Sequence, residues 1–288
     1  MLSKDLIICL DKPKGITSAK ATDIVKKRLD QPKAGHTGTL DPIATGLLII
    51  CLNRATRISN LFSKLKKQYD FTMKLGVTTD TLDADGRITK DYGDVEIEKE
   101  ELEAILKSFI GEIKQIPPMF SAKKHKGKPL YKFARRGVEV DREPKTVTIY
   151  DLNLKRFEPP FITISVTCST GTFIRTLCDD IGKKLGVGAH VTELRRMRIG
   201  PFSVEDATTL DELTESRKGF YTIDEALSWL PEAVVKATVI KRIIHGNPIT
   251  LNDLYHLSKG KLQPHTLLKI KSPENELLSI GVYDNYKK

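Results

Sequence analysis

The spacing of the hydrophobic residues alternates along this chain between two regular periods, and this alternation limits the folds that the chain can adopt. Between 68 and 75, aromatic and aliphatic side chains occupy every second position, which predicts a half-buried strand. Between 98 and 110, apolar residues lie three or four positions apart and Gly111 follows, which predicts an amphipathic helix. Because strands and helices mix without a regular strand–helix–strand repeat, we expect an α+β fold rather than a doubly wound parallel sheet.

Local composition indicates further elements. The continuous apolar runs at 6–10 and 47–52 predict buried strands. Ser18 is expected to cap the helix that follows the first of these runs, because serine oxygens accept hydrogen bonds from the first helical N–H groups. The remaining predicted elements are strands near 145–156 and 161–168 and a helix near 172–186.

Pro231 marks the expected boundary between two domains. At 288 residues the chain is long enough for one large domain with a smaller appendage. The last 58 residues close with a strand-like sequence, ELLSIGVYD. We therefore expect one domain at 1–230 and a small α+β or β-barrel appendage at 231–288.

The charge of the chain favours a polyanionic partner. Lysine and arginine outnumber aspartate and glutamate by 47 to 37. Much of the excess lies at 121–136, which has no acid and seven cations: Lys123, Lys124, Lys126, Lys128, Lys132, Arg135 and Arg136. Such a segment can follow a phosphate backbone, and its interleaved His125, Tyr131 and Phe133 can stack on bases. A solvated basic face without such a partner is the alternative that composition leaves open.

Several classes of site lack support in the sequence. The four cysteines form no C-x-x-C pair and no metal-ligand spacing, so we expect reduced thiols, a cytoplasmic protein and no metal. The N-terminal apolar run of five residues is too short for a signal peptide or a membrane span. DTLDADG at 80–86 resembles a calcium loop but has Thr81 and Tyr92 where carboxylates are required, which favours a structural turn. A metal-dependent nuclease lacks clustered carboxylates and histidines.

Two charged residues stand in unusual surroundings. Asp41 is the only acid in GHTGTLDPIATGLL at 35–48, where it could simply begin an Asp-Pro turn. Arg175 lies among apolar residues in the first turn of a predicted helix. Such an arginine either has a fixed anionic partner, because unpaired burial is costly, or extends along the helix to solvent. The local sequence alone does not decide whether Asp41 does more than begin a turn, or which of the two alternatives holds for Arg175.

Taken together, these stretches resemble the TruB family of tRNA pseudouridine synthases. The resemblance covers roughly residues 4–230 and consists of five motifs in order. The motifs read DKPKGITS, GHTGTLDPIATGLL, KKQYDFTMKLGVTTDTLDADG, QIPPMFSAKKHKGKPLYKFARRG and STGTFIRTLCDDIGKKLGVGAHVTELRRMRIGPF. The fourth is similar to the RNA-gripping insertion of bacterial members and places it here at about 115–145. Residues 231–288 resemble the family's RNA-binding PUA domain only loosely, and they are short for one.

The resemblance implies a mixed-sheet catalytic domain that isomerises a T-loop uridine of tRNA, position 55, to pseudouridine. The base is flipped out, detached from N1 and rejoined through C5, without cofactor or metal. The bacterial-type insertion implies a stand-alone enzyme that binds the T-arm stem-loop without a guide RNA, and we expect a monomer. The alternative is an RNA-binding or tRNA-folding protein in which catalysis is not needed.

The resemblance also assigns roles to individual residues. Asp41, Arg175 and Tyr69 match the catalytic aspartate, the arginine that pairs with it and the tyrosine that stacks on the target base. The residues that match substrate-binding positions are His36, Lys12, Pro13, Leu194 and Phe173. Phe173 stands where many relatives have tyrosine, so it keeps a stacking surface but lacks the hydroxyl. The seven cations at 121–136 match the surface that holds RNA.

Overall fold

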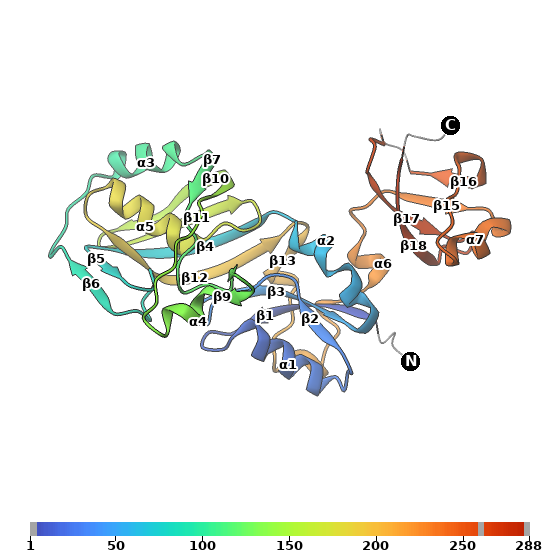
Figure 1. The fold of residues 1–288 in the computed structure, drawn as a ribbon, viewed down its shortest axis with the longest axis horizontal. Helices are drawn as coiled ribbons and strands as arrows, with labels where there is room; N and C mark the ends of the chain where they lie inside the picture. The colour runs from blue at the N-terminus through green and yellow to red at the C-terminus, as the bar shows by residue number, and fades with distance from the viewer. Residues whose placement is uncertain (1–4, 259–261, 285–288) are drawn as a thin grey trace. The chain divides into compact units, whose positions relative to one another are not determined.

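The computed structural model describes residues 5–258 and 262–284, which form two compact units (Figure 1). The larger unit ends at Phe220 and the smaller begins at Tyr221, within β14 (Phe220–Thr222). The division thus precedes the expected boundary at Pro231. The reason is that α6 (Ile223–Ala226) pairs with the smaller unit: Asp224 contacts Lys269 and Lys271 at 2.8 and 2.9 Å. No helix of the described residues is long and apolar enough to cross a membrane.

A mixed sheet forms the framework of the larger unit, as the α+β prediction requires. Its strands lie in the order β1 (Leu6–Lys12), β3 (Thr45–Leu52), β12 (Ala189–Ile199), β4 (Lys67–Leu75), β11 (Phe161–Cys168), β10 (Lys145–Glu158) and β7 (Gly111–Gln115). The short strands β2 (Ala34–His36) and β13 (Phe202–Ser203) pair with β3 and β12. β3 and β12 run parallel, whereas β1 and β3 and the neighbours from β12 to β7 run antiparallel.

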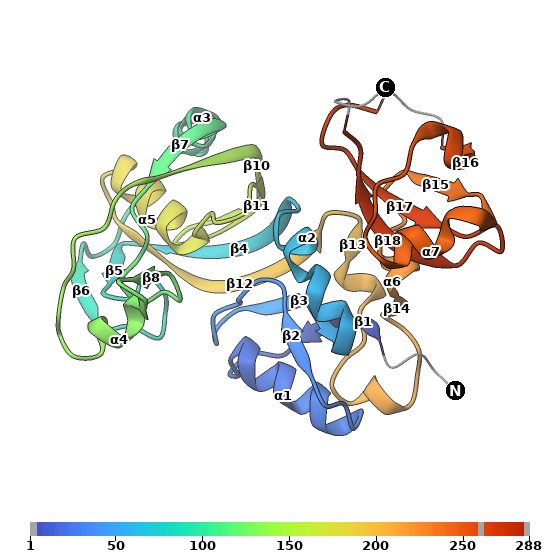
Figure 2. The ribbon, with the colours of Figure 1, turned by 45° about the vertical axis from the view of Figure 1, so that its right-hand side comes forward.

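The two periods in the sequence correspond to the buried faces of these elements. Every second residue of β4 is buried, which confirms the half-buried strand predicted there. α3 (Lys99–Ser108) and α5 (Ile174–Lys184) bury their apolar faces in a core shared with β4 and β11 (Figures 1 and 2). α1 (Ser18–Arg28) covers a second core beneath β1 and β3.

Shorter elements complete the larger unit. After β3 the chain forms a 3-10 helix at Asn53–Ile58 and α2 (Ser59–Ser63). The remaining pieces are β5 (Val77–Thr79), β6 (Ile88–Asp91), β8 (Lys124–His125), β9 (Lys128–Pro129), α4 (Leu130–Ala134), and 3-10 helices at Val204–Asp206 and Glu212–Thr214.

Ser18 does not cap α1 as predicted. Thr17 occupies that position, and its side chain accepts a hydrogen bond from the N–H of Lys20. The Ser18 hydroxyl is buried instead and bonds both the N–H and the carbonyl of Leu40, at 2.7 and 3.0 Å. The serine therefore fixes the backbone next to Asp41, a long-range contact that helix-capping rules do not address.

The smaller unit is built on a sheet in the order β16 (Leu254–Leu257), β15 (Glu232–Val235), β17 (Leu267–Lys271) and β18 (Leu277–Val282). It also contains α7 (Ile240–Ile244) and 3-10 helices at Ala237–Val239 and Leu251–Asp253. The predicted small β domain is thus confirmed, but in the residues described here the sheet is open, because its edge strands β16 and β18 pair with single neighbours.

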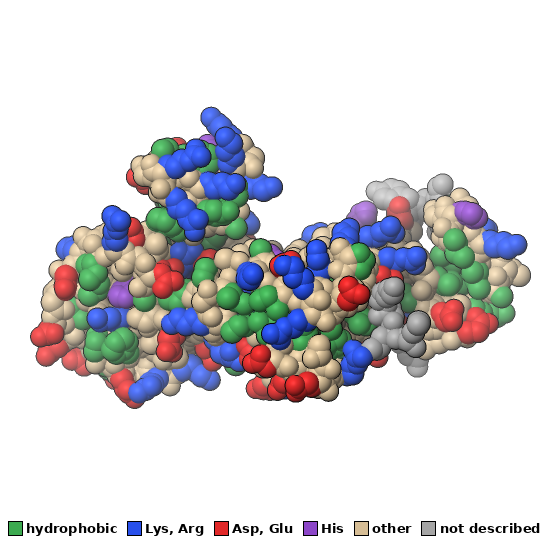
Figure 3. Space-filling model, turned by 90° about the horizontal axis from the view of Figure 1, so that it is seen from below, with side chains coloured by type: hydrophobic (Ala, Val, Ile, Leu, Met, Phe, Trp, Pro, Cys, Tyr) green, Lys and Arg blue, Asp and Glu red, His purple; other side chains and the backbone are tan. Residues whose placement is uncertain are grey.

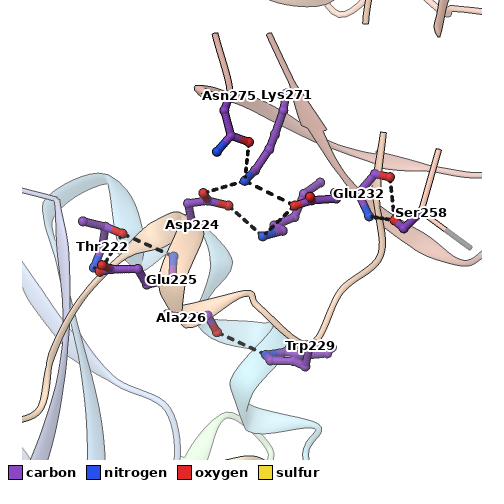
Figure 4. A network of polar contacts seen from close by, with 10 residues as sticks. Thr222, Asp224, Glu225, Ala226, Trp229, Glu232, Ser258, Lys271 and Asn275 are labelled. Carbon is purple, nitrogen blue, oxygen red and sulfur yellow. Dashed lines mark hydrogen bonds and ion pairs between the residues drawn. The ribbon is translucent and has the colours of Figure 1, made fainter. Parts of the chain in front are cut away.

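A buried charge cluster joins α6 to this sheet (Figure 4). The ammonium groups of Lys269 and Lys271 each contact Asp224 and Glu232, at 2.8 to 3.3 Å, and Lys271 also bonds Asn275. Both lysines are about 5% exposed, so their charges require such partners.

Gly46 should be essential where β3 meets β12, because it lies opposite Arg196 with a φ of +98°. A Cβ at this position would lie 2.7 Å from the Arg196 backbone nitrogen and 3.0 Å from its carbonyl carbon. Gly46→Ala should therefore lower the free energy of unfolding by about 2–5 kcal/mol, from left-handed strain and overpacking together. Chemical denaturation measures this change.

Gly15→Ala is the matched control, because Gly15 also has a positive φ of +88° but its Cβ would meet nothing within 4 Å. It should lose only about 1–2 kcal/mol from backbone strain. Equal losses in the two variants would show that the approach of β3 to β12 does not depend on the missing Cβ.

Candidate active site

A cavity of about 380 Å3 opens in the larger unit between segments that are far apart in sequence. Its walls come from the loop between β2 and β3, the start of β4, residues 121–123, the turn at 169–173, the first turn of α5, and β12. A volume of this size suits a small ligand or a single nucleotide. Asp41 is the only acid among the lining residues.

Arg175 lies at the convergence of these walls and is 4% exposed. Its guanidinium contacts the carboxylates of Asp41 at 2.9 Å and Asp83 at 3.2 Å. It also donates hydrogen bonds to the carbonyls of Thr81, at 2.6 Å, and Phe120, at 2.7 Å. The structure thus gives Arg175 a fixed anionic partner, and the alternative of an arginine extended to solvent is wrong.

Asp83 is a partner of Arg175 that the sequence reasoning missed. It lies in the turn at 80–86, where its carboxylate accepts hydrogen bonds from the Thr81 hydroxyl and the Asp85 N–H. Burial raises the pKa of Asp83, and the Thr81 hydrogen bond and Arg175 act in the opposite direction. Aspartate is so common in turns that nothing in this motif distinguished Asp83 as a partner of Arg175. Among the residues described, no cluster of three or more histidine, cysteine, aspartate or glutamate side chains could hold a metal.

Three other residues that match catalytic or substrate-binding positions line the cavity with Asp41 and Arg175. Tyr69, on β4, is 9% exposed, and burial raises the pKa of its phenol. Leu194, on β12, is equally enclosed. Phe173 precedes α5, and the buried amide of Gln115 bonds both its N–H and its carbonyl. The cavity therefore offers aromatic and aliphatic surfaces beside an ion pair.

Lys12, Pro13 and His36 do not line the cavity. The Lys12 ammonium is fully buried and donates to the carbonyls of Pro13 and Ile16, at 2.7 and 2.8 Å. Burial lowers the pKa of Lys12 to about 8, although Asp41 opposes this shift. His36, on β2, has its pKa lowered by burial and by Arg196. Lys12 and His36 are thus near the charges of the site without reaching its surface, and Pro13 is exposed.

Arg196 is a second buried cation that the sequence reasoning did not select. It is 1% exposed, and its guanidinium donates to the carbonyls of Leu47 and Gly38 at 2.6 and 3.0 Å, so it holds the loop of Asp41 from both ends. Its guanidinium carbon lies 5.9 Å from the centre of the Tyr69 ring. Because Arg196 is two residues beyond Leu194 on β12, the period of a strand could have placed both on one face.

The basic segment projects from the sheet between β7 and β10. Gln115 and Lys145 pair across these strands, so 116–144 leaves and returns at one position. All seven of its selected cations are exposed, and Lys123 also lines the cavity. Figure 3 shows lysine and arginine side chains gathered on a lobe of the surface. His125 packs edge-on against Phe133, and Arg135 lies over Tyr131, so the interleaved aromatics help to order this segment.

Comparison with known proteins gives consistent similarities. A "tRNA pseudouridine synthase B" of Dechloromonas aromatica is 44% identical over 252 residues, covering 86% of this chain and 84% of that protein. One of Syntrophotalea carbinolica is also 44% identical, covering 85% and 81%. Among solved structures, a chain of a Cbf5-Nop10-Gar1 complex superposes with a TM-score of 0.77 at 29% identity, covering 98% of this chain and 79% of that one.

Two family models divide most of the chain between them. Residues 26–174 match the N-terminal domain of the TruB family pseudouridylate synthases, which includes Asp41, Tyr69 and Asp83. Residues 175–234 match the tRNA pseudouridylate synthase B C-terminal domain, which begins at Arg175. With these matches and relatives at 44% identity over most of their length, the chain belongs to the TruB family of pseudouridylate synthases.

Proposed function

We propose that this protein isomerises a uridine of tRNA to pseudouridine, with Asp41 as the catalytic carboxylate. The observation that carries the proposal is the ion pair between Asp41 and the buried Arg175 in the wall of a cavity of nucleotide size. The bond between N1 and the ribose carbon breaks, a bond from C5 to that carbon forms, and the proton of C5 is lost while N1 gains one. The reaction therefore needs neither oxidant nor hydrolytic water.

In this proposal three residues have separate roles. The Asp41 carboxylate, 34% exposed, can reach a nucleoside in the cavity and act on either the uracil ring or the ribose. Arg175 orients that carboxylate, because hydrogen bonds to the carbonyls of Thr81 and Phe120 fix its guanidinium. Tyr69 presents an aromatic surface on which the base can stack. A uridine inside an RNA fold must be flipped out to reach them, at roughly a few kcal/mol.

The substrate we propose is the T-loop of tRNA at position 55, held without a guide RNA. Support comes from the relatives named tRNA pseudouridine synthase B and from the exposed cations of 121–136. In this proposal the chain acts as a monomer, and the smaller unit adds RNA-binding surface. The alternative of an RNA-binding or tRNA-folding protein explains the basic segment. It gives no reason, however, for an acid that is paired with a buried arginine in a cavity.

Incubation with an unmodified tRNA transcript, followed by mapping of pseudouridine, tests the proposal. We expect one pseudouridine, in the T-loop of that transcript, formed by the purified protein without a guide RNA. Tight tRNA binding without any pseudouridine would favour the RNA-binding alternative. Pseudouridine that forms only with an added guide RNA would contradict the stand-alone assignment.

The basic segment should contribute affinity rather than chemistry. We expect a weaker salt dependence when four of its lysines are replaced with glutamine: Lys123, Lys124, Lys126 and Lys128. Each phosphate contact contributes about −0.7 to the slope of log affinity against log salt concentration, because counterions are released. Loss of four contacts should therefore make the slope shallower by roughly two to three units. The single-turnover rate at saturating RNA should change much less. Titrations across a salt series, with rates measured beside them, give both quantities.

Lys107→Gln on α3 is the control for a lost surface charge, since this lysine is exposed and lies outside the basic segment. It should leave the slope unchanged. A quadruple variant with the wild-type slope would show that these four lysines face solvent. A collapsed rate with an unchanged slope would show instead that the segment orders the cavity.

A further inference from the structure

Most cations that line the cavity are already engaged by the protein. Arg175 holds Asp41, and Arg196 donates to two backbone carbonyls. Lys67 donates to the carbonyls of Ser63 and Leu65, and burial lowers its pKa to about 8. Lys123 and Lys145 differ, because both are exposed and neither makes an ion pair or side-chain hydrogen bond with any residue that the structure describes. Lys123 belongs to the basic segment, whereas Lys145 lies on β10.

Lys145 stands at a specific place, the first residue of β10, against the glycine of the turn at 169–173. A Cβ on Gly171 would touch the Lys145 ammonium and lie 3.4 Å from its Cε. Gly171 also has a φ of +83°, a conformation that glycine adopts readily. The lysine stem therefore lies across the turn in the space that a larger residue would fill.

The turn itself is held at both ends. Ser169 exchanges hydrogen bonds with Thr148 of β10, N–H to carbonyl and N–H to hydroxyl, each at 2.9 Å. At the other end, the Gln115 amide bonds both backbone groups of Phe173. The Thr172 hydroxyl bonds the Ser169 carbonyl across the turn. Because Gln115 pairs directly with Lys145 across the sheet, the lysine and the turn are placed by the same two strands.

We propose that Lys145 binds a backbone phosphate of the RNA next to the uridine in the cavity. This inference rests on the proposed function, since it takes the ligand to be a nucleotide within RNA. An ammonium group without an acidic partner, in a cavity whose only acid is already paired with Arg175, favours an anion at the rim. A phosphate held there would position the nucleotide while Asp41 acts on it.

The experiment pairs Lys145→Gln with RNA stem-loops that carry a single neutral methylphosphonate, either 5′ or 3′ of the target uridine. On normal RNA, Lys145→Gln should weaken binding about fivefold to tenfold, as expected for one exposed charge-assisted contact. On one of the two methylphosphonate RNAs, the wild type and the variant should bind equally, because the contacted charge is already absent. Similar losses on all three RNAs would overturn the proposal.

Lys114→Gln is the matched control. Lys114 is exposed on the neighbouring strand β7, and it pairs with Thr146, so its side chain lies on the opposite face of the sheet from Lys145. It should give no loss that depends on the position of the methylphosphonate. A loss equal in size and pattern to that of Lys145→Gln would mean that general surface charge, and not this position, is being measured.

Gly171→Ala is a second test that keeps the positive charge. The new methyl group would displace the Lys145 ammonium, so the variant should lose the same methylphosphonate-dependent part of the affinity. Wild-type affinity in a folded Gly171→Ala protein would contradict the proposed placement. These are binding measurements, so a failure here is separate from a failure of the proposed function, which would appear as absence of pseudouridine from the wild-type reaction.

Discussion

Replacing Asp41 with asparagine should abolish pseudouridine formation and leave tRNA binding near the wild-type level. Asparagine keeps the shape of the side chain but removes the charge and the nucleophilic oxygen. Arg175 would remain fixed, because Asp83 and the carbonyls of Thr81 and Phe120 still hold it. We expect the single-turnover rate to fall by more than about a hundredfold, as when a charge at the reacting centre is lost.

Asp11→Asn is the control, because Asp11 also pairs with an arginine, Arg195, at 2.6 Å, but does not line the cavity. It should leave the single-turnover rate close to that of the wild type. Asp41 would be rejected as the catalytic group if the Asp41→Asn variant bound tRNA with about the wild-type affinity and kept more than one-tenth of the wild-type rate. Rates should be measured at saturating RNA so that binding does not enter.

The parts of the fold that could be predicted are those encoded by local spacing. The alternation at 68–75 specifies which face of β4 is buried, and the apolar runs at 6–10 and 47–52 specify strands buried on both faces. The domain boundary depends on contacts that spacing does not contain. Asp224 belongs with the smaller unit because its partners Lys269 and Lys271 lie far along the chain, whereas Pro231 offered only a local signal.

The candidate site shows the same limit in its chemistry. Three of the five motifs supply residues that do meet, since Asp41, Tyr69, Phe173, Arg175 and Leu194 line one cavity. Motifs describe each segment alone, however, and partners supplied by backbone carbonyls or by a distant turn leave no sequence pattern. Asp83, Arg196 and Lys145 were therefore missed, and Lys12, Pro13 and His36, which match substrate-binding positions, do not line the cavity.

Arg175→Met should reduce the single-turnover rate by about a hundredfold or more, because the lost guanidinium both orients Asp41 and balances its charge. Methionine fills the space but removes the positive charge between Asp41 and Asp83, so the two carboxylates repel each other. A carboxylate that loses a neighbouring cation takes up a proton more readily. The residual rate of the variant should consequently rise with pH more steeply than that of the wild type, since higher pH restores the ionised carboxylate.

A purely structural role for Arg175 predicts a different result, and three further measurements separate the two. Removing one partner of a buried ion pair lowers the free energy of unfolding by about 3 kcal/mol, so thermal unfolding must show that Arg175→Met is folded at the assay temperature. Arg195→Met removes the arginine of the Asp11 pair outside the cavity and should retain the wild-type pH profile. Arg175→Lys keeps the charge but cannot reach four acceptors at once, so it should recover part of the rate and lose the steep pH dependence. A folded Arg175→Met enzyme with wild-type rate and pH profile would show that Asp41 works without its arginine.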